Sequence, residues 1–151
     1  MSLQSRLDEE LKEAMRTGDK LRRSVIRYLR SEIHNQEITN QTTLDDQDVL
    51  KVLTHQARQH RESIEAYSQG NRQDLVNKEE AELAIILEYL PEQMSREDIA
   101  ILVNEAIGTL KATDIGDIGK VMQRVMPQVR GKAEGRDVNT IALDLLRKTS
   151  D

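Results

Sequence analysis

The chain of 151 residues is 37% hydrophobic and 32% charged, and it has three tyrosines but neither phenylalanine nor tryptophan. A core of this aliphatic kind favours helix packing over sheet, because aromatic and β-branched side chains are those enriched in strands. The absence of cysteine excludes disulfides, thiolate metal sites and cysteine nucleophiles, and the net charge of −5 argues against a globally basic nucleic-acid-binding protein.

The sequence shows neither of two membrane-related patterns. Residues 1–8 contain no apolar signal core, and no stretch approaches the roughly 18 apolar residues that a membrane-spanning helix needs. A chain without cysteine is typical of a reducing compartment. We therefore expect a cytoplasmic protein with no membrane partner.

Apolar residues recur at helical spacing nearly throughout the chain. Leu3, Leu7 and Leu11 step by four along the first predicted helix, and Ser95 with Asp98 at the capping-box position predicts the start of the fifth. Capping residues and helix breakers define seven predicted helices, at about residues 3–18, 19–38, 45–70, 73–90, 95–110, 114–127 and from 137 onward. No segment has the pattern of a β-strand, so the sequence predicts an all-α fold.

Proline and glycine mark the predicted helix ends and the domain boundary. Pro91 is expected to stop the fourth helix, Pro127 to end or kink the sixth, and Gly131–Gly135 to form a glycine-bracketed loop. The break that begins at Pro91 divides the chain into a four-helix N-terminal lobe, residues 1–90, and a three-helix C-terminal lobe, residues 91–151.

The side chains that carry chemistry form no recognisable catalytic pattern. His55 and His60 lie five residues apart, not at the four-residue spacing of metal ligands on one helix face. The acidic runs at residues 45–48 and 79–82 are interpreted as solvated carboxylates on polar helix faces. There is no nucleophile elbow, Walker motif or dinucleotide-binding glycine run. We therefore predict no catalytic residue, no metal and no cofactor.

The second predicted helix carries a row of cations. Its members step by three or four residues along one side: Lys20, Arg23, Arg27 and Arg30. Cations at this spacing can line a phosphate backbone, or they can pair with acidic residues on neighbouring helices. Both interpretations of this secondary basic face stay open.

The clearest charge feature is the segment 111–136, where six cations and three anions give a local charge of +3 and leave −8 for the rest of the chain. Its candidate phosphate-binding residues are Lys120, Arg124, Arg130, Lys132 and Arg136. Gly119 suggests a close backbone approach or a helix start, and Gly131 and Gly135 permit positive φ in a loop whose amides face an anion. The alternative for these glycines is a tight turn that packs two short helices.

Six segments together resemble the YqeY-like family. In chain order they are Arg61–Tyr67, Gly70–Leu75, Lys78–Leu83, Glu88–Gln93, Gly119–Met122 and Gly131–Gly135. They extend over essentially the whole chain, and the run Tyr-Leu-Pro-Glu-Gln is the most specific. On these segments the chain is identified as a member of the YqeY-like family.

The resemblance implies an all-helical fold whose C-terminal lobe is similar to the tail domain of the B subunit of the aspartyl/glutamyl-tRNA amidotransferase. That enzyme is a carbon–nitrogen ligase with glutamine as amido donor, and its tail helps to grip tRNA. The corresponding positions here are Gly119–Met122 and Gly131–Gly135. The kinase-like catalytic body of the B subunit has no counterpart in this chain.

Three functional hypotheses follow. The first is a non-catalytic accessory protein that binds tRNA through phosphate contacts. The second is a helical protein-interaction module that docks on a tRNA-metabolism enzyme without touching RNA, which the acidic remainder of the chain supports. The third, amide-ligase activity of the chain itself, lacks a visible catalytic constellation.

Overall fold

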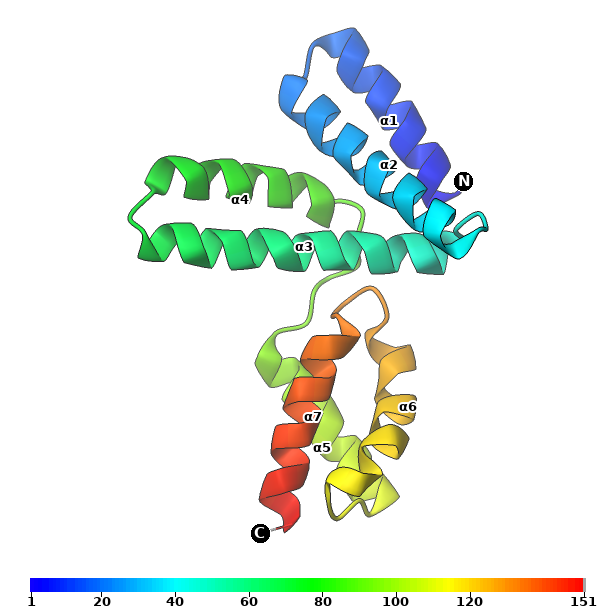
Figure 1. Cartoon of the computed structure of the whole chain (residues 1–151), viewed down its shortest axis with the longest axis vertical. Helices are drawn as coiled ribbons and strands as arrows, with labels where there is room; N and C mark the ends of the chain where they lie inside the picture. Colours follow the sequence, from blue (N-terminus) through cyan, green and yellow to red (C-terminus); the bar gives the residue numbers. More distant parts are fainter. Residues whose placement is uncertain (151) are drawn as a thin grey trace. The chain divides into compact units, whose positions relative to one another are not determined.

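The computed structural model describes residues 1–150, which form seven α-helices and one 3₁₀ turn, with no β-strand in that range (Figure 1). This confirms the all-α fold expected from the spacing of apolar residues. The chain divides into two compact units, Met1–Pro91 and the residues from Glu92 onward, here called unit 1 and unit 2. Among the described helices, none combines the length and the apolar character that spanning a bilayer requires.

Unit 1 consists of two helical hairpins. Its helices are α1 (Leu3–Thr17), α2 (Lys20–Asn40), α3 (Asp46–Gln69) and α4 (Gln73–Leu87). Helix α1 packs against α2 and α3 against α4, and α2 also contacts both helices of the second hairpin (Figure 1). The hairpins share an aliphatic core whose fully buried members include Leu7, Ile26, Leu29, Val49, Leu53 and Ile86. Burial of these apolar stripes, rather than helix propensity alone, holds the four helices together.

Local side chains define several helix ends in unit 1. The carboxylate of Asp19 accepts a hydrogen bond from the Arg22 N–H at 3.1 Å, and that of Asp45 accepts one from the Asp48 N–H at 2.9 Å. Both residues therefore act as N-caps. Gly18 ends α1 at φ 77°, a left-handed conformation that glycine adopts without a Cβ penalty. These ends lie where the sequence predicts them.

Unit 2 is a three-helix bundle with its own aliphatic core. Its elements are α5 (Arg96–Leu110), the 3₁₀ turn η1 (Ile115–Asp117), α6 (Ile118–Val129) and α7 (Gly135–Ser150). Each helix of the bundle packs on the other two. The fully buried core residues include Val103, Val121, Val125, Val129, Val138 and Leu146. The Ser95 Oγ accepts from the Asp98 N–H at 3.1 Å and the Asp98 carboxylate accepts from the Ser95 N–H at 3.4 Å, which confirms the expected capping box.

Three helix limits in unit 2 differ from the sequence expectation. The segment after Asp114 forms a 3₁₀ turn, so α6 begins only at Ile118. Pro127 does not end α6, which continues to Val129, and α7 begins at Gly135 rather than at Asp137. Pro127 lies only two residues from the end of α6. The burial of Val129 compensates there for the backbone hydrogen bond that proline cannot donate.

Candidate nucleic-acid interface

Two of the predicted phosphate-binding residues project from α6. Lys120 and Arg124 lie four residues apart, so their side chains emerge on the same side of the helix, and both are exposed. The Lys120 Nζ lies 4.0 Å from the Asp117 carboxylate, yet 75% of the Lys120 side chain remains accessible. A hydrogen bond from the Thr113 N–H to Asp117 at 2.9 Å is the main reason why the pKa of Asp117 is lowered. Asp117 therefore stays anionic and offsets part of the Lys120 charge.

The turn between α6 and α7 is built on the carbonyl of Val129. The N–H groups of Lys132 and Ala133 both donate to this carbonyl, at 2.8 Å and 3.1 Å. Gly131 lies between Val129 and these donors, is buried, and has φ 78°. The expectation that the loop amides face an anion is therefore wrong for these two residues, because their N–H groups are already used within the turn.

The segment that precedes α5 holds the same turn from the other side. The Gln93 side-chain amide donates to the Gly131 carbonyl at 2.8 Å, and the Met94 N–H donates to the Lys132 carbonyl at 3.0 Å. Gln93, the last residue of one segment that suggested the family, thus contacts Gly131 of another within unit 2. Their contact fixes the backbone from which the Lys132 side chain projects.

The remaining cations of this region extend into solvent. Four side chains are exposed and make no ion pair within the part of the chain that the structure describes: Arg124, Arg130, Lys132 and Arg136. Arg136 lies in the first turn of α7, where the helix dipole adds positive potential. We call these four residues and Lys120 the basic hairpin of unit 2. They follow one another along α6, the turn and the start of α7, and Glu134 is the one carboxylate between Lys120 and Arg136 in the sequence.

The three glycines of this region have different roles. Gly119 is the second residue of α6, and a Cβ built there meets nothing within 4 Å, so it marks a helix start and not a close approach. Among the described residues, the glycines with positive φ are Gly18 and Gly131, so Gly135 does not use the positive φ that the sequence analysis expected of it. A Cβ on Gly135 would lie 3.4 Å from the Met126 Cε, which is the close packing of two short helices that the sequence left as the alternative.

Substituting Gly119 and Gly131 with alanine is expected to have opposite effects on stability. Gly119→Ala should raise the free energy of unfolding by about 0.4–1 kcal/mol, because the site is open and alanine has less conformational entropy to lose on folding. Gly131→Ala should lower it by about 1–2 kcal/mol, because φ 78° is strained for an L-residue. Urea unfolding of both variants beside the wild type measures the two changes. Equal changes in the two variants would contradict this assignment of roles.

The secondary basic face on α2 is only partly engaged in ion pairs. Arg30 Nε lies 2.8 Å from the Asp8 carboxylate on α1, which is the pairing alternative. Arg27 contacts the Met15 sulfur at 3.9 Å. Lys20 is exposed and Arg23 half-buried, and neither has an ion pair among the residues described.

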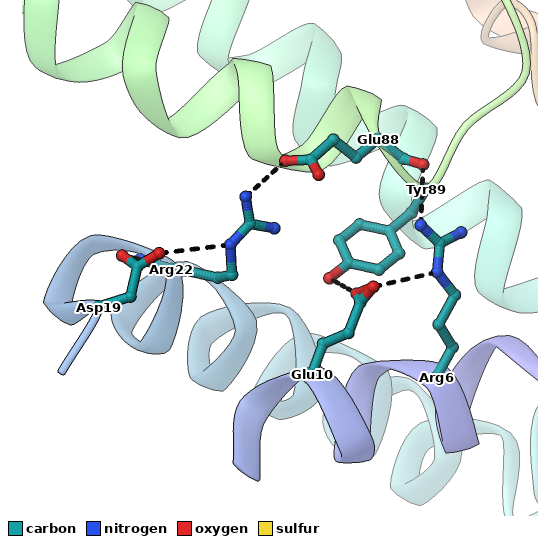
Figure 2. A network of polar contacts seen from close by, with 6 residues as sticks. All are labelled: Arg6, Glu10, Asp19, Arg22, Glu88 and Tyr89. Atoms are coloured by element: carbon teal, nitrogen blue, oxygen red, sulfur yellow. Dashed lines mark hydrogen bonds and ion pairs between the residues drawn. The ribbon is translucent and has the colours of Figure 1, made fainter. Parts of the chain in front are cut away.

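A polar network that the sequence did not predict closes the end of unit 1 (Figure 2). Tyr89 is 4% exposed, its hydroxyl donates to the Glu10 carboxylate on α1, and the Arg6 guanidinium lies 4.5 Å from its ring centre. Arg22 on α2 bonds the Glu88 carboxylate at 2.8 Å. Burial first, and then the hydrogen bond to Glu10, raise the pKa of Tyr89 above its ordinary value. The Tyr-Leu-Pro-Glu-Gln segment was the available signal, but the partners of Tyr89 lie far away in sequence.

A second cluster that the sequence missed joins α3 and α4. His60 and the carboxylates of Glu79 and Glu82 converge, and all three side chains are largely buried. The interpretation of residues 79–82 as fully solvated is therefore wrong for Glu79 and Glu82, because α4 turns both toward α3. Among the residues described, this is the set whose ligand atoms lie close enough to hold a metal ion.

The fold and the basic hairpin define a small all-α protein with two helical units and a cationic surface, a class that carries many functions. The model of the Yqey-like protein family matches residues 4–146. The chain therefore belongs to the YqeY-like family, as its motifs indicated.

Several curated relatives come from fungi. The chain is 32% identical over 130 residues to the protein named "Altered inheritance of mitochondria protein 41, mitochondrial" of Pyrenophora tritici-repentis, covering 85% of this chain and 71% of that protein. Proteins of the same name from Vanderwaltozyma polyspora and Lachancea thermotolerans are 38% and 41% identical over 85 residues. Each of these matches covers 56% of this chain and 46% of the relative, so the chain matches less than half of the length of these two.

These names correct the expected location. The prediction of a cytoplasmic protein is contradicted by relatives that are named as mitochondrial. The prediction rested on the absence of a signal core, of a membrane-spanning stretch and of cysteine. The absence of cysteine excludes disulfides but does not distinguish one reducing compartment from another.

Proposed function

We propose that this protein is a non-catalytic accessory protein that binds tRNA through phosphate contacts of the basic hairpin of unit 2. The observation that carries the proposal is the group of four exposed cations without ion pairs, Arg124, Arg130, Lys132 and Arg136, that follow Lys120 along the chain. Cations that are already neutralised by carboxylates contribute little to polyanion binding, whereas unpaired ones release condensed counterions when they meet phosphates.

The composition of unit 2 favours phosphate contacts over base stacking. The three tyrosines of the chain are Tyr28, Tyr67 and Tyr89, so no aromatic side chain lies in unit 2. Sequence-specific readers of single-stranded RNA stack bases on aromatic side chains, and that platform is missing here. The proposed ligand is therefore a folded RNA such as tRNA, recognised by the shape of its phosphate backbone.

A titration against bulk tRNA at two or more salt concentrations tests the proposal. The variant reverses three cations of the basic hairpin, Lys120→Glu, Arg124→Glu and Lys132→Glu. The matched control reverses three exposed lysines of unit 1, Lys12→Glu, Lys51→Glu and Lys78→Glu, so that both variants have the same net charge. Each phosphate contact contributes roughly 0.7–0.9 to the slope of log K against log salt. The hairpin variant should therefore lose about 2–3 from this slope.

The two variants separate a local contact from a general effect of charge. The control should retain most of the slope and affinity of the wild type. Equal losses in both variants would assign binding to net charge alone and overturn the assignment to the hairpin. If the wild type does not bind tRNA even at low salt, the RNA proposal fails, and a protein partner that docks on the helical faces becomes the function to test.

A further inference from the structure

The cluster of His60, Glu79 and Glu82 belongs to unit 1 and shares no residue with the proposed RNA contact. His60 is on α3, and the two glutamates lie three residues apart on α4, on one side of that helix. Their side chains are 12%, 20% and 21% exposed. We propose that these three residues form a binding site for a divalent transition-metal ion, of the Zn²⁺ or Mn²⁺ class.

The distances between the candidate ligand atoms suit a single metal ion. The His60 Nε2 lies 3.1 Å from the Glu82 Oε2 and 3.6 Å from the Glu79 Oε2. Metal–ligand bonds of about 2.1 Å in tetrahedral geometry place neighbouring ligand atoms about 3.4 Å apart. All three atoms lie within 4.8 Å of one another, so one ion reaches all of them with small side-chain adjustments.

The imidazole of His60 is held in the form that a metal ligand needs. Its Nδ1 lies 2.9 Å from the backbone carbonyl of Gln56. A carbonyl only accepts hydrogen bonds, so Nδ1 carries the proton and the Nε2 faces the two carboxylates. Metal-bound histidines have this arrangement, in which the far ring nitrogen donates to a carbonyl that fixes the ring orientation.

The charge pattern around the cluster suits a cation. Two carboxylate oxygens and one imidazole nitrogen converge there, all within 4.8 Å of one another. A divalent ion placed between them would interact favourably with all three ligand atoms. No lysine or arginine lines the adjoining cavity among the residues described, and Glu79 and Glu82 have ion pairs there only with His60.

The site opens into a cavity that has room for the remaining ligands of the ion. The cavity has a volume of about 330 Å³, and its wall includes the polar side chains of Ser24, Tyr28 and Ser63 beside the cluster. Three protein ligands leave positions for water or for a small ligand, the open coordination that distinguishes reactive from structural zinc sites. One nitrogen and two oxygens, with no thiolate, favour Zn²⁺ or Mn²⁺ over soft ions, and the imidazole disfavours Mg²⁺.

Metal titrations of the full chain after treatment with a chelator test this proposal. Zn²⁺ and Mn²⁺ should each bind with one ion per chain by calorimetry and raise the Tm, because an ion shared by α3 and α4 binds the folded state. Mg²⁺ should do neither at the same concentrations. His60→Gln and Glu82→Gln should each weaken binding at least tenfold. The controls His34→Gln and Glu80→Gln replace an exposed residue of the same kind and should bind like the wild type.

A measurement on the wild type makes the test independent of how the variants fold. The ring ¹⁵N resonances of His60 should shift at Nε2 when Zn²⁺ is added, while Nδ1 keeps its proton. Absence of binding to the wild type, or unchanged binding in His60→Gln, would overturn the proposal and leave His60 as a structural hydrogen-bonding partner of Glu82. Either result is independent of the tRNA titration.

Discussion

Replacing Tyr89 with alanine is expected to lower the free energy of unfolding by about 3–5 kcal/mol, the range for removing a large buried aromatic side chain. The ring is 4% exposed and belongs to the core cluster of unit 1. The substitution also removes the surface on which the Arg6 guanidinium lies and the donor to Glu10. Urea unfolding followed by circular dichroism measures the change. A loss below about 1 kcal/mol would show that the network in Figure 2 contributes little to stability.

Tyr89→Phe is the matched control, because it removes the hydroxyl and keeps the ring. Its expected cost is about 1 kcal/mol, since one hydrogen bond to a partly exposed carboxylate is lost. Most of the effect of Tyr89→Ala should therefore come from packing. If Tyr89→Phe costs as much as Tyr89→Ala, the hydrogen bond and not the buried ring is the dominant contribution.

The wild type and Tyr89→Phe should also differ in how their stability changes at alkaline pH. The pKa of Tyr89 is raised in the folded chain, so the folded state holds this proton more tightly than the unfolded state does. The resulting stabilisation is fully present below the ordinary tyrosine pKa of about 10 and is lost as the pH rises above it. The wild type should thus lose stability more steeply above pH 10 than Tyr89→Phe, and Tyr28 contributes equally to both.

Leu146→Ala is expected to cost about 2–5 kcal/mol in unit 2. Leu146 on α7 is fully buried in the core that also contains Val103 of α5 and Val121 of α6. Loss of its side chain leaves a cavity at the centre of the three-helix bundle. Amide hydrogen exchange should accelerate in all three helices, because they share one core.

The neighbouring residue provides the control for this prediction. Leu145 is partly buried and packs at the edge of the same cluster, so Leu145→Ala removes the same atoms from a less enclosed site. Its effect on exchange should be clearly smaller than that of Leu146→Ala. Equal effects of the two substitutions would show that Leu146 does not lie closer to the centre of the unit 2 core than Leu145 does.

The all-α fold, most helix ends and the family were determined by the sequence alone. Two kinds of signal depend only on neighbours within four residues and can be predicted without a structure. One is the helical spacing of aliphatic residues, and the other is capping by Asp19, Asp45 and the Ser95–Asp98 pair. Local signals failed where packing opposed them. Proline disfavours a helix because it lacks the backbone N–H, but α6 continues for two residues past Pro127. The buried valines of α6 favour this continuation by packing in the core.

Only the tertiary structure decided which polar side chains meet. Tyr89 and Glu10 are 79 positions apart, and His60 and Glu82 are 22 apart, so no local pattern connects them. The same holds for the basic hairpin: its cations were visible in the sequence, but the sequence did not show that four of them make no ion pair among the described residues. The rotation of each helix about its own axis is fixed by the burial of its apolar side. That rotation brings Glu79 and Glu82 to His60 and leaves Arg124 and Arg136 in solvent.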